Sequence, residues 1–353
     1  MTPNEVRDKM CIYYGVSPSL TYKNQEHVFP AGLGGNKKLP NDYVSDQANK
    51  QFSPMELKLM RSSLISFERM MFGPGDRGSL QPRKASKSLV NVGVQDDNEV
   101  VLSYTALGKP YNIPQIHLYM DNARLSIPSG QSETSQQISQ IVDALRNFSG
   151  KFVFLPYDGF CEGEMIIGFF EGKYYVSSMG TRPSVEYIQE KIRIFLNNFR
   201  EGELQKGEHH VQQNYHLVEN EEIARVYAKV AMNTLALIKG KEYAMHKNFD
   251  EIREWILTGK SKCEFFCLPS LLTNELSHLV KIFPDGSHWC LFSKIGTTLE
   301  AMVCFYNRFM RRFTFGEVVY QTDFVYPNGF ICDWKNEKEY TLEEFIYRIT
   351  NTP

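Results

Sequence analysis

The pattern of apolar and polar positions predicts alternating helical and strand-like segments. Four segments place apolar residues at three- and four-residue steps, as one face of a helix requires. They are 53–72, 132–148, 221–240 and 249–259. The first is long enough for two helices, the second has a Ser- and Thr-rich start suited to capping, and the last two end at Gly240 and Gly259. The helix over 221–240 has the most continuous apolar face and is interpreted as the core helix of a second domain.

Ten further segments predict strands, because they are rich in β-branched and aromatic residues and are bounded by Gly, Pro or Asp. They are 99–107, 114–120, 151–157, 164–170, 172–179, 262–269, 278–286, 288–296, 299–306 and 316–327. Glu171 and Gly172 are predicted to form a hairpin turn, and polar residues 199–220 a solvated loop. The mixture predicts an α+β fold.

Length and composition add a division into domains. The 353 residues exceed what one hydrophobic core usually serves, and 42% hydrophobic with 23% charged residues is typical of globular proteins. The segment 73–89 combines Gly, Pro and Ser with four basic residues, which is typical of a linker or a phosphate-facing loop. We therefore expect a small domain over 1–80, a basic linker over 81–92 and a larger α+β domain over 93–353. This larger domain is expected to sense a signal, bind a protein partner or form a homo-oligomer.

The charge distribution qualifies the near-neutral total. The net charge is −2, but residues 1–90 carry thirteen Lys and Arg against eight Asp and Glu. The first 90 residues therefore have a net charge of +5 and the remainder −7, so nucleic-acid binding is assigned to the N-terminal part. No run of eighteen apolar residues occurs, and four of the first ten residues are charged. We therefore expect a cytoplasmic protein without a membrane partner.

The residues that carry chemistry lie between 25 and 49. Glu26 and His27 are followed by a Gly-rich stretch, by Asn41 and by Asn49. Hydrolysis of a phosphodiester needs a base for the attacking water and a cation for the phosphate charge; histidine is the natural base near neutral pH. Carboxylate and amide oxygens suit Mg²⁺ or Mn²⁺. A strand ending at His27, a Gly-rich connection, a second strand and a helix starting near Ser45 would bring these groups together.

The stretch from Glu26 to Gly35 reads EHVFPAGLGG and resembles the HNH endonuclease superfamily, in the branch whose signature continues with an Asn and then C-x-x-C-N. The similarity covers about residues 8–77. It implies a small ββα-metal domain that hydrolyses double-stranded DNA. In related nucleases the helix of this motif lies on the minor-groove side and contacts mainly the DNA backbone, which implies modest sequence preference. Related architectures also imply a role in bacterial anti-phage defence.

The resemblance implies a role for each matching residue. His27 aligns with the general base, and Glu26 and Asn49 align with the ligands of Mg²⁺ or Mn²⁺. Asn41 aligns with the central Asn that holds the base-bearing loop; Asn36 is the alternative but falls earlier in the sequence. Five basic residues are expected to contact DNA phosphates. They are Lys37, Lys38, Arg77, Arg83 and Lys84.

One part of the family pattern is missing. Related sequences carry a structural zinc on two Cys-x-x-Cys pairs, whereas Tyr14, Ser45 and Ala48 stand at three of the four positions and only Cys11 remains. One thiol cannot build a Cys₄ site, so no structural zinc is expected. The seven scattered cysteines are expected to be reduced thiols.

Two alternatives stay open beside the metal-dependent endonuclease. The lost cysteines favour a degenerate scaffold that binds nucleic acid or protein without catalysis. The larger domain favours a latent nuclease that a C-terminal ligand or partner switches on.

Overall fold

The computed structural model describes residues 10–17, 19–120, 122–128, 133–200, 207, 210–215, 217–260, 270–271 and 281–351. The chain forms two compact units, one made of Met1–Ser86 and Leu217–Pro353 and the other of Lys87–His216. We call them unit 1 and unit 2. Unit 2 is therefore inserted into the sequence of unit 1, between its N-terminal and C-terminal segments.

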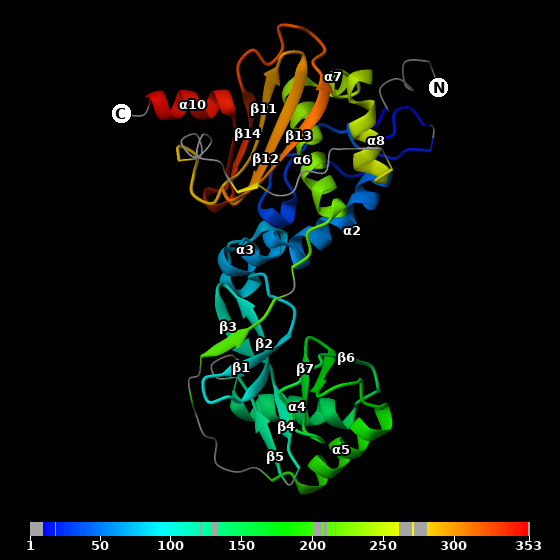
Figure 1. Ribbon diagram of the computed structural model, residues 1–353, viewed down its shortest axis with the longest axis vertical. Helices are drawn as coiled ribbons and strands as arrows, with labels where there is room; N and C mark the ends of the chain where they lie inside the picture. Colours follow the sequence, from blue (N-terminus) through cyan, green and yellow to red (C-terminus); the bar gives the residue numbers. More distant parts are fainter. Residues whose placement is uncertain are drawn as a thin grey trace. The chain divides into compact units, whose positions relative to one another are not determined.

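Unit 1 combines helices with one antiparallel sheet (Figure 1). Its helical elements are η1 (Ala31–Leu33), α2 (Asp46–Ser62), α3 (Leu64–Phe72), η2 (Asp76–Gly78), η3 (Pro82–Lys84), α6 (Glu221–Lys239), α7 (Lys241–Ala244), η4 (Lys247–Phe249), α8 (Asp250–Thr258), η5 (Trp334–Asn336) and α10 (Leu342–Asn351). Its strands are β10 (Ser270–Leu271), β11 (His288–Ile295), β12 (Thr298–Phe305), β13 (Phe309–Glu317), β14 (Asn328–Asp333) and β15 (Lys338–Thr341). They lie in the order β10-β13-β12-β11-β14-β15.

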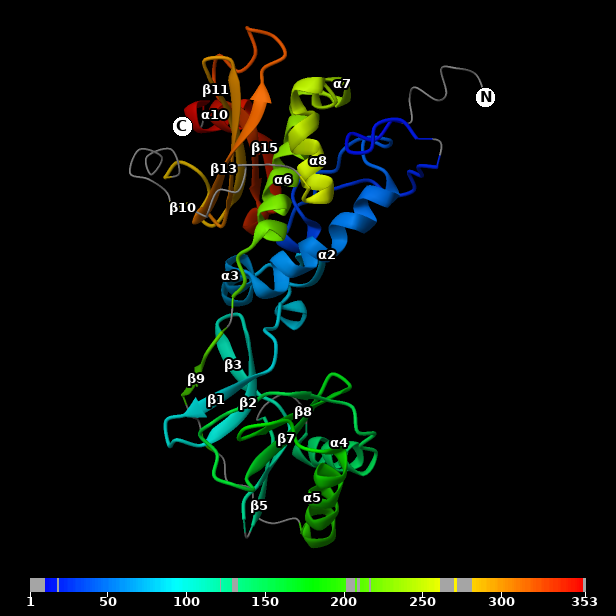
Figure 2. The ribbon, with the colours of Figure 1, turned by 45° about the vertical axis from the view of Figure 1, so that its right-hand side comes forward.

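Helix α6 is the centre of unit 1. Asn220 caps its first turn, where its side-chain oxygen accepts a hydrogen bond from the amide of Ile223 at 3.2 Å, and the helix ends before Gly240 at φ 89°. One side of α6 contacts the sheet, and other sides contact α2 and α8, as Figure 2 shows. Residues on every side of its middle turns are therefore buried, including the polar Lys229, Asn233 and Thr234.

The N-terminal and C-terminal segments of unit 1 share one hydrophobic core. Phe29 illustrates this, because its ring lies 6.2 Å from that of Phe305 in β12 and 6.4 Å from that of Phe330 in β14. The expected division into domains over 1–80 and 93–353 therefore differs from the compact units. Helix α6, expected in the second domain, packs on α2 of the N-terminal segment as well as on α8 and the C-terminal sheet.

The described residues of unit 2 form two sheets and two helices. The first sheet has the order β3-β2-β1-β9 and the second β5-β4-β7-β8-β6, in which only β6 and β8 pair in parallel. The bounds are β1 (Asn91–Gln95), β2 (Val100–Ala106), β3 (Lys109–Asn112), β4 (Gln115–Leu118), β5 (Ala123–Ser126), α4 (Thr134–Arg146), β6 (Phe152–Phe154), β7 (Met165–Phe170), β8 (Lys173–Ser178), α5 (Val185–Asn198) and β9 (Val211–Gln213). Apolar side chains of α4 and α5 pack on the second sheet.

The predicted α+β class is confirmed, and most of the predicted helices and strands are present. The hairpin turn at Glu171 and Gly172 joins β7 to β8. The predicted strand over 316–327 is wrong beyond Glu317, because the side chain of Asp323 accepts the amide of Tyr320 at 3.1 Å and closes a turn. The predicted strand over 262–269 lies outside the described residues, as does 278–280 of another, whose described part, 281–286, is turns and bends.

The expected linker over 81–92 is in part folded onto unit 1. Residues 82–84 form η3, and the hydroxyl of Ser86 donates to the carbonyl of Pro74 at 3.1 Å. Strand β1 of unit 2 then starts at Asn91. The chain therefore passes from one unit to the other over a short stretch after Ser86.

Candidate functional site

The candidate residues follow the predicted order of a hairpin and a helix. The amide of Val28 donates to the carbonyl of Lys37 at 2.9 Å, and the amide of Leu39 donates to the carbonyl of Glu26 at 2.8 Å. His27 and Lys38 form an antiparallel bridge between them, so the hairpin is shorter than two regular strands. Helix α2 then begins at Asp46 with Ser45 as its N-cap, as predicted. An HNH fold remains an expectation.

The Gly-rich loop between the two sides of the hairpin packs into the C-terminal sheet. A Cβ atom on Gly35 would lie 2.2 Å from the carbonyl oxygen of Phe29, and one on Gly34 would lie 2.5 Å from the Cβ of Trp334. The ring of His288 in β11 contacts the carbonyl of Leu33 through Nε2 at 3.1 Å. Glycine is therefore needed here for close backbone packing inside unit 1.

Glu26, the first predicted metal ligand, binds an ammonium group. Its Oε1 accepts a hydrogen bond from Nζ of Lys229, which also donates to Oε1 of Glu56 in α2. The side chain of Lys229 is 1% exposed, against 12% for Glu26 and 20% for Glu56. Burial alone lowers the pKa of Lys229, but the two carboxylates more than offset burial and raise it. Lys229 is therefore a buried, charged lysine.

Asn49, the second predicted ligand, lies in the first turn of α2. Its Oδ1 is buried and receives no hydrogen bond from any residue that the structure describes. A buried amide oxygen without a donor is a suitable ligand for a cation. Asn49 and Glu56 are seven residues apart in α2, so they lie on the same face of this helix, two turns apart.

His27 has a partly buried ring, and its backbone is held by α6. The carbonyl of His27 accepts a hydrogen bond from Nδ2 of Asn233 at 2.9 Å, and Oδ1 of Asn233 accepts one from the hydroxyl of Tyr13 at 2.7 Å. Burial, followed by Lys38 and Lys229, lowers the pKa of His27. The ring is therefore uncharged near neutral pH, the form in which an imidazole can accept a proton from water.

Asn41 does not share these surroundings. Its side chain is exposed in the turn before α2. The hydrogen bond to the His27 segment comes instead from Asn233, 206 residues further along the chain. The loop-holding role of Asn41 stays a prediction, as does the alternative role of Asn36, whose amide donates to Glu339 at 3.1 Å.

The five predicted DNA-binding cations are all exposed. Lys37 and Lys38 lie on the second side of the hairpin, Arg77 in η2, and Arg83 and Lys84 in η3. Element η2 contacts η1 of the Gly-rich loop, where a Cβ on Gly78 would lie 2.8 Å from the carbonyl oxygen of Ala31. The fold therefore brings Arg77 close to the loop that follows His27.

At the positions where the HNH resemblance implies zinc ligands in other sequences, protein groups contact one another directly. The thiol of Cys11 is buried and accepts the amides of Tyr13 and Ser45, each at 3.4 Å. Ala48 is fully buried, whereas Tyr14 is 38% exposed and donates to Gln51. Packing of the chain on Cys11 therefore joins the N-terminal turn to the start of α2.

The donor set does not fit a divalent ion bound through Glu26 in this arrangement. Within the described part of the chain, no group of three or more His, Cys, Asp and Glu side chains could hold a metal ion. Asn49 offers a free oxygen, but Glu26 already binds the positive charge of Lys229. In this arrangement, Glu26 and Asn49 are therefore not assigned a divalent ion that takes part in catalysis.

Three residues of this site were absent from the sequence predictions: Glu56, Lys229 and Asn233. The helix that holds Lys229 and Asn233 was interpreted as an apolar core helix. Their spacing of four places both on one face of α6 among Val, Ala, Met and Leu. Two polar residues on one face of an otherwise apolar helix indicate buried partners, and this is the signal that could have found them.

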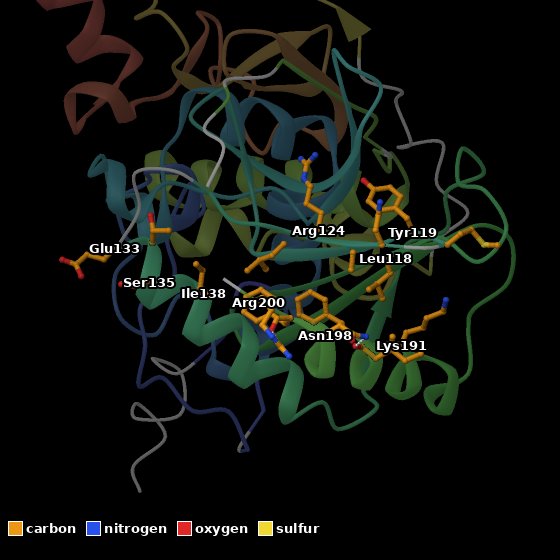
Figure 3. Close-up of a pocket in the computed structure, with 17 residues that line it drawn as sticks. Leu118, Tyr119, Arg124, Glu133, Ser135, Ile138, Lys191, Asn198 and Arg200 are labelled. Atoms are coloured by element: carbon orange, nitrogen blue, oxygen red, sulfur yellow. Dashed lines mark hydrogen bonds between the residues drawn. The ribbon is translucent and has the colours of Figure 1, made fainter. Parts of the chain in front are cut away.

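Unit 2 contains a separate pocket of about 1040 Å³. Strands β4 and β5 and helices α4 and α5 supply its walls, and Figure 3 shows Glu133, Ser135 and Ile138 on one side and Lys191 on the opposite side. Arg124, Lys191 and Arg200 outnumber Glu133 as charged lining residues. The guanidinium of Arg124 also binds Glu99 at 2.5 Å. An excess of positive charge over an apolar floor suits an anionic ligand.

Comparisons with known proteins add no relative. No family model matches the chain, and neither a curated protein nor a solved structure matches it significantly. Among the helices of the described residues, none has the length and apolar character needed to cross a membrane.

Proposed function

We propose that the protein hydrolyses phosphodiester bonds in DNA with His27 as the general base, and that the arrangement described above is its resting form. The observation that carries the proposal is the half-buried, uncharged imidazole of His27 on the hairpin, next to Glu26. The unpartnered Oδ1 of Asn49 and the exposed cations Lys38 and Arg77 add to its support. Destruction of foreign DNA is the setting that the HNH resemblance implies.

A plasmid assay tests this proposal. Supercoiled plasmid is incubated with the full chain in Mg²⁺ and in Mn²⁺, and nicked and linear products are measured over time. Removal of a general base lowers the rate by roughly 10²- to 10⁴-fold, which is the loss expected for His27→Ala. His210→Ala is the matched control, because His210 is exposed in unit 2. Equal cutting by His27→Ala and wild type would rule out His27 as the base.

The pocket in unit 2 favours a nuclease that a ligand switches on. Its cationic lining suits a phosphate-bearing molecule, so ATP and inorganic phosphate are suitable first probes. We expect cutting to appear or rise when the activating ligand is added, and to be insensitive to it in Lys191→Ala. Cutting that is constant with every probe would argue against this form of control.

A binding module without catalysis is the second candidate, and the ion pair between Lys229 and Glu26 favours it. Such a module would shift DNA in a gel with an affinity that falls steeply with salt, and would leave the plasmid intact. Reversal of charge by Lys38→Glu would weaken that shift. Cutting that depends on His27 would exclude this candidate.

A further inference from the structure

Glu26 and Glu56 share one ammonium group in the interior of unit 1. The two carboxylates belong to the hairpin and to α2, and Lys229 reaches both from α6. Carboxylates this close together repel each other in the absence of a positive charge between them. The three side chains therefore form an internal cation site in which the cation is part of the chain.

The ammonium group of Lys229 has little freedom to leave this site. It donates to the two carboxylates, and its Nζ lies 5.4 Å from the centre of the Phe52 ring, so a cation–π contact covers a further side. The single proton of the Tyr13 hydroxyl is shared between Oδ1 of Asn233, at 2.7 Å, and the carbonyl of Lys229 one turn earlier, at 3.3 Å. The backbone of α6 that carries Lys229 is thus fixed to the N-terminal segment.

A divalent ion bound to Glu26 would meet this ammonium directly. The resemblance assigns Glu26 and Asn49 to such an ion, but Lys229 already neutralises one of the two negative charges. A second cation beside a buried ammonium is repelled, and repulsion is strong where water is excluded. One site cannot hold both cations favourably.

We propose that Lys229 and a divalent cation compete for the carboxylate of Glu26, so that Lys229 keeps this site free of metal. The inference rests on the proposed function only through the HNH resemblance that underlies it, which makes Glu26 a metal ligand. Competition for the carboxylate is an equilibrium property and is measured without catalysis. Loss of the ammonium leaves the carboxylates of Glu26 and Glu56 without their cation and available to Mn²⁺.

The experiment titrates Mn²⁺ into the full chain and measures free Mn²⁺ by electron paramagnetic resonance. Lys229→Met keeps an unbranched side chain of nearly the same length and removes its charge. We expect this variant to bind one Mn²⁺ at least tenfold more tightly than wild type, and we expect Lys229→Met combined with Glu26→Gln to lose the gain. Lys58→Met is the matched control, because Lys58 pairs with a single carboxylate among the described residues, that of Glu222, at a half-exposed position.

Two results would overturn the proposal. One is equal Mn²⁺ binding by wild type and Lys229→Met, whether tight or absent. The other is a single Mn²⁺ in wild type that Glu26→Gln removes. If Lys229→Met does not fold in the absence of metal, Mn²⁺ must restore its circular dichroism, since the ion then replaces the ammonium; no restoration counts against the proposal.

The same samples separate this inference from the proposed function. Tight Mn²⁺ binding by Lys229→Met without plasmid cutting would leave the competition intact and argue against the nuclease. Cutting by wild type with Mn²⁺ bound at Glu26 would support the nuclease and exclude the competition.

Discussion

His288 is a fully buried histidine whose two ring nitrogens are both used. Nδ1 accepts the amide of Tyr306 at 3.0 Å, so the proton belongs on Nε2, which donates to the carbonyl of Leu33 at 3.1 Å. The ring is therefore neutral, and burial lowers its pKa from 6.5 to about 3. Through this contact, a residue of the C-terminal sheet supports the loop that follows His27.

The neutral His288 predicts that unit 1 loses stability in acid. Its folded pKa lies below the unfolded value, so the unfolded chain binds the proton more tightly between pH 6.5 and about 3. Between pH 6.5 and about 3, this single group lowers the free energy of unfolding by about 1.4 kcal/mol for each pH unit, and it contributes little pH dependence outside this window. In His288→Gln we expect lower stability at pH 7 and a shallower loss between pH 6 and pH 4.

Urea unfolding at several pH values measures this difference. All three tryptophans, Trp255, Trp289 and Trp334, lie in unit 1, so their fluorescence follows this unit alone. Parallel pH profiles for wild type and His288→Gln would show that His288 does not cause the acid sensitivity.

The sequence alone was informative about residue types in the candidate site but not about their partners. Glu26, His27 and Asn49 are recognisable because their order matches a known motif over a short stretch. Lys229 contacts Glu26 across 203 residues of sequence, and Asn233 contacts His27 across 206. Local spacing carries no information on such contacts, so the charge state and neighbours of the site required the fold.

At the scale of elements, the Gly-rich loop between Phe29 and Asn36 joins the hairpin to the C-terminal sheet. Gly34 has φ 87° and lies against Trp334, while Gly35 lies against the backbone of Phe29. Arg69 of α3 adds a hydrogen bond to the carbonyl of Gly32 at 2.8 Å. The loop is thus fixed by α3 and by the turn after β14.

Gly35→Ala is expected to destabilise unit 1 by about 3 kcal/mol, the upper part of the range for overpacking, because the new methyl group would lie 2.2 Å from a backbone oxygen. Gly15→Ala is the control: Gly15 has φ 68°, but apart from its chain neighbours no described residue has an atom within 4 Å of its Cβ position. Gly15→Ala is therefore expected to lower the free energy of unfolding only through backbone strain, by about 1 kcal/mol. Urea midpoints followed by tryptophan fluorescence compare the two, and equal losses would contradict the packing role of Gly35.

Helices and strands were predictable where residues close in the sequence determine where they begin and end. The cap at Ser45 and the ends at Gly240 and Gly259 are local, and the helices they bound are present. Helix α5 was not predicted although Ser184 caps it and Ile188, Ile192 and Phe195 form its buried face. Aromatic residues 318–326 suggested a strand, but Asp323 binds Lys239 of α6 at 2.8 Å and so favours a turn.

At the scale of the whole molecule, the N-terminal candidate site depends on segments that follow unit 2 in the sequence. The resemblance over residues 8–77 suggested an independent small domain. Its apolar residues, such as Phe29 and Leu33, are instead buried by α6 and the C-terminal sheet. Sequence proximity therefore misplaced the boundary, because the chain completes the first core only after residue 217.

This organisation predicts which fragments fold. Residues 1–92 alone are expected to remain unfolded by circular dichroism, because the surfaces that α6 and the sheet cover would be exposed to water. A chain in which a flexible Gly- and Ser-rich linker replaces 87–216 keeps the whole core of unit 1. We expect it to unfold cooperatively in urea, as followed by tryptophan fluorescence. Residues 87–216 alone are expected to fold around their own core between α4, α5 and the second sheet.

The fragments also locate any control over the candidate site. If the linker-joined unit 1 cuts plasmid without a ligand while the full chain does not, unit 2 restrains the site. If both are inactive and Lys229→Met activates both in Mn²⁺, the restraint lies in the pairing of Lys229 with Glu26, inside unit 1. A folded fragment of residues 1–92 would contradict this organisation, since its core would then not require the segment after unit 2.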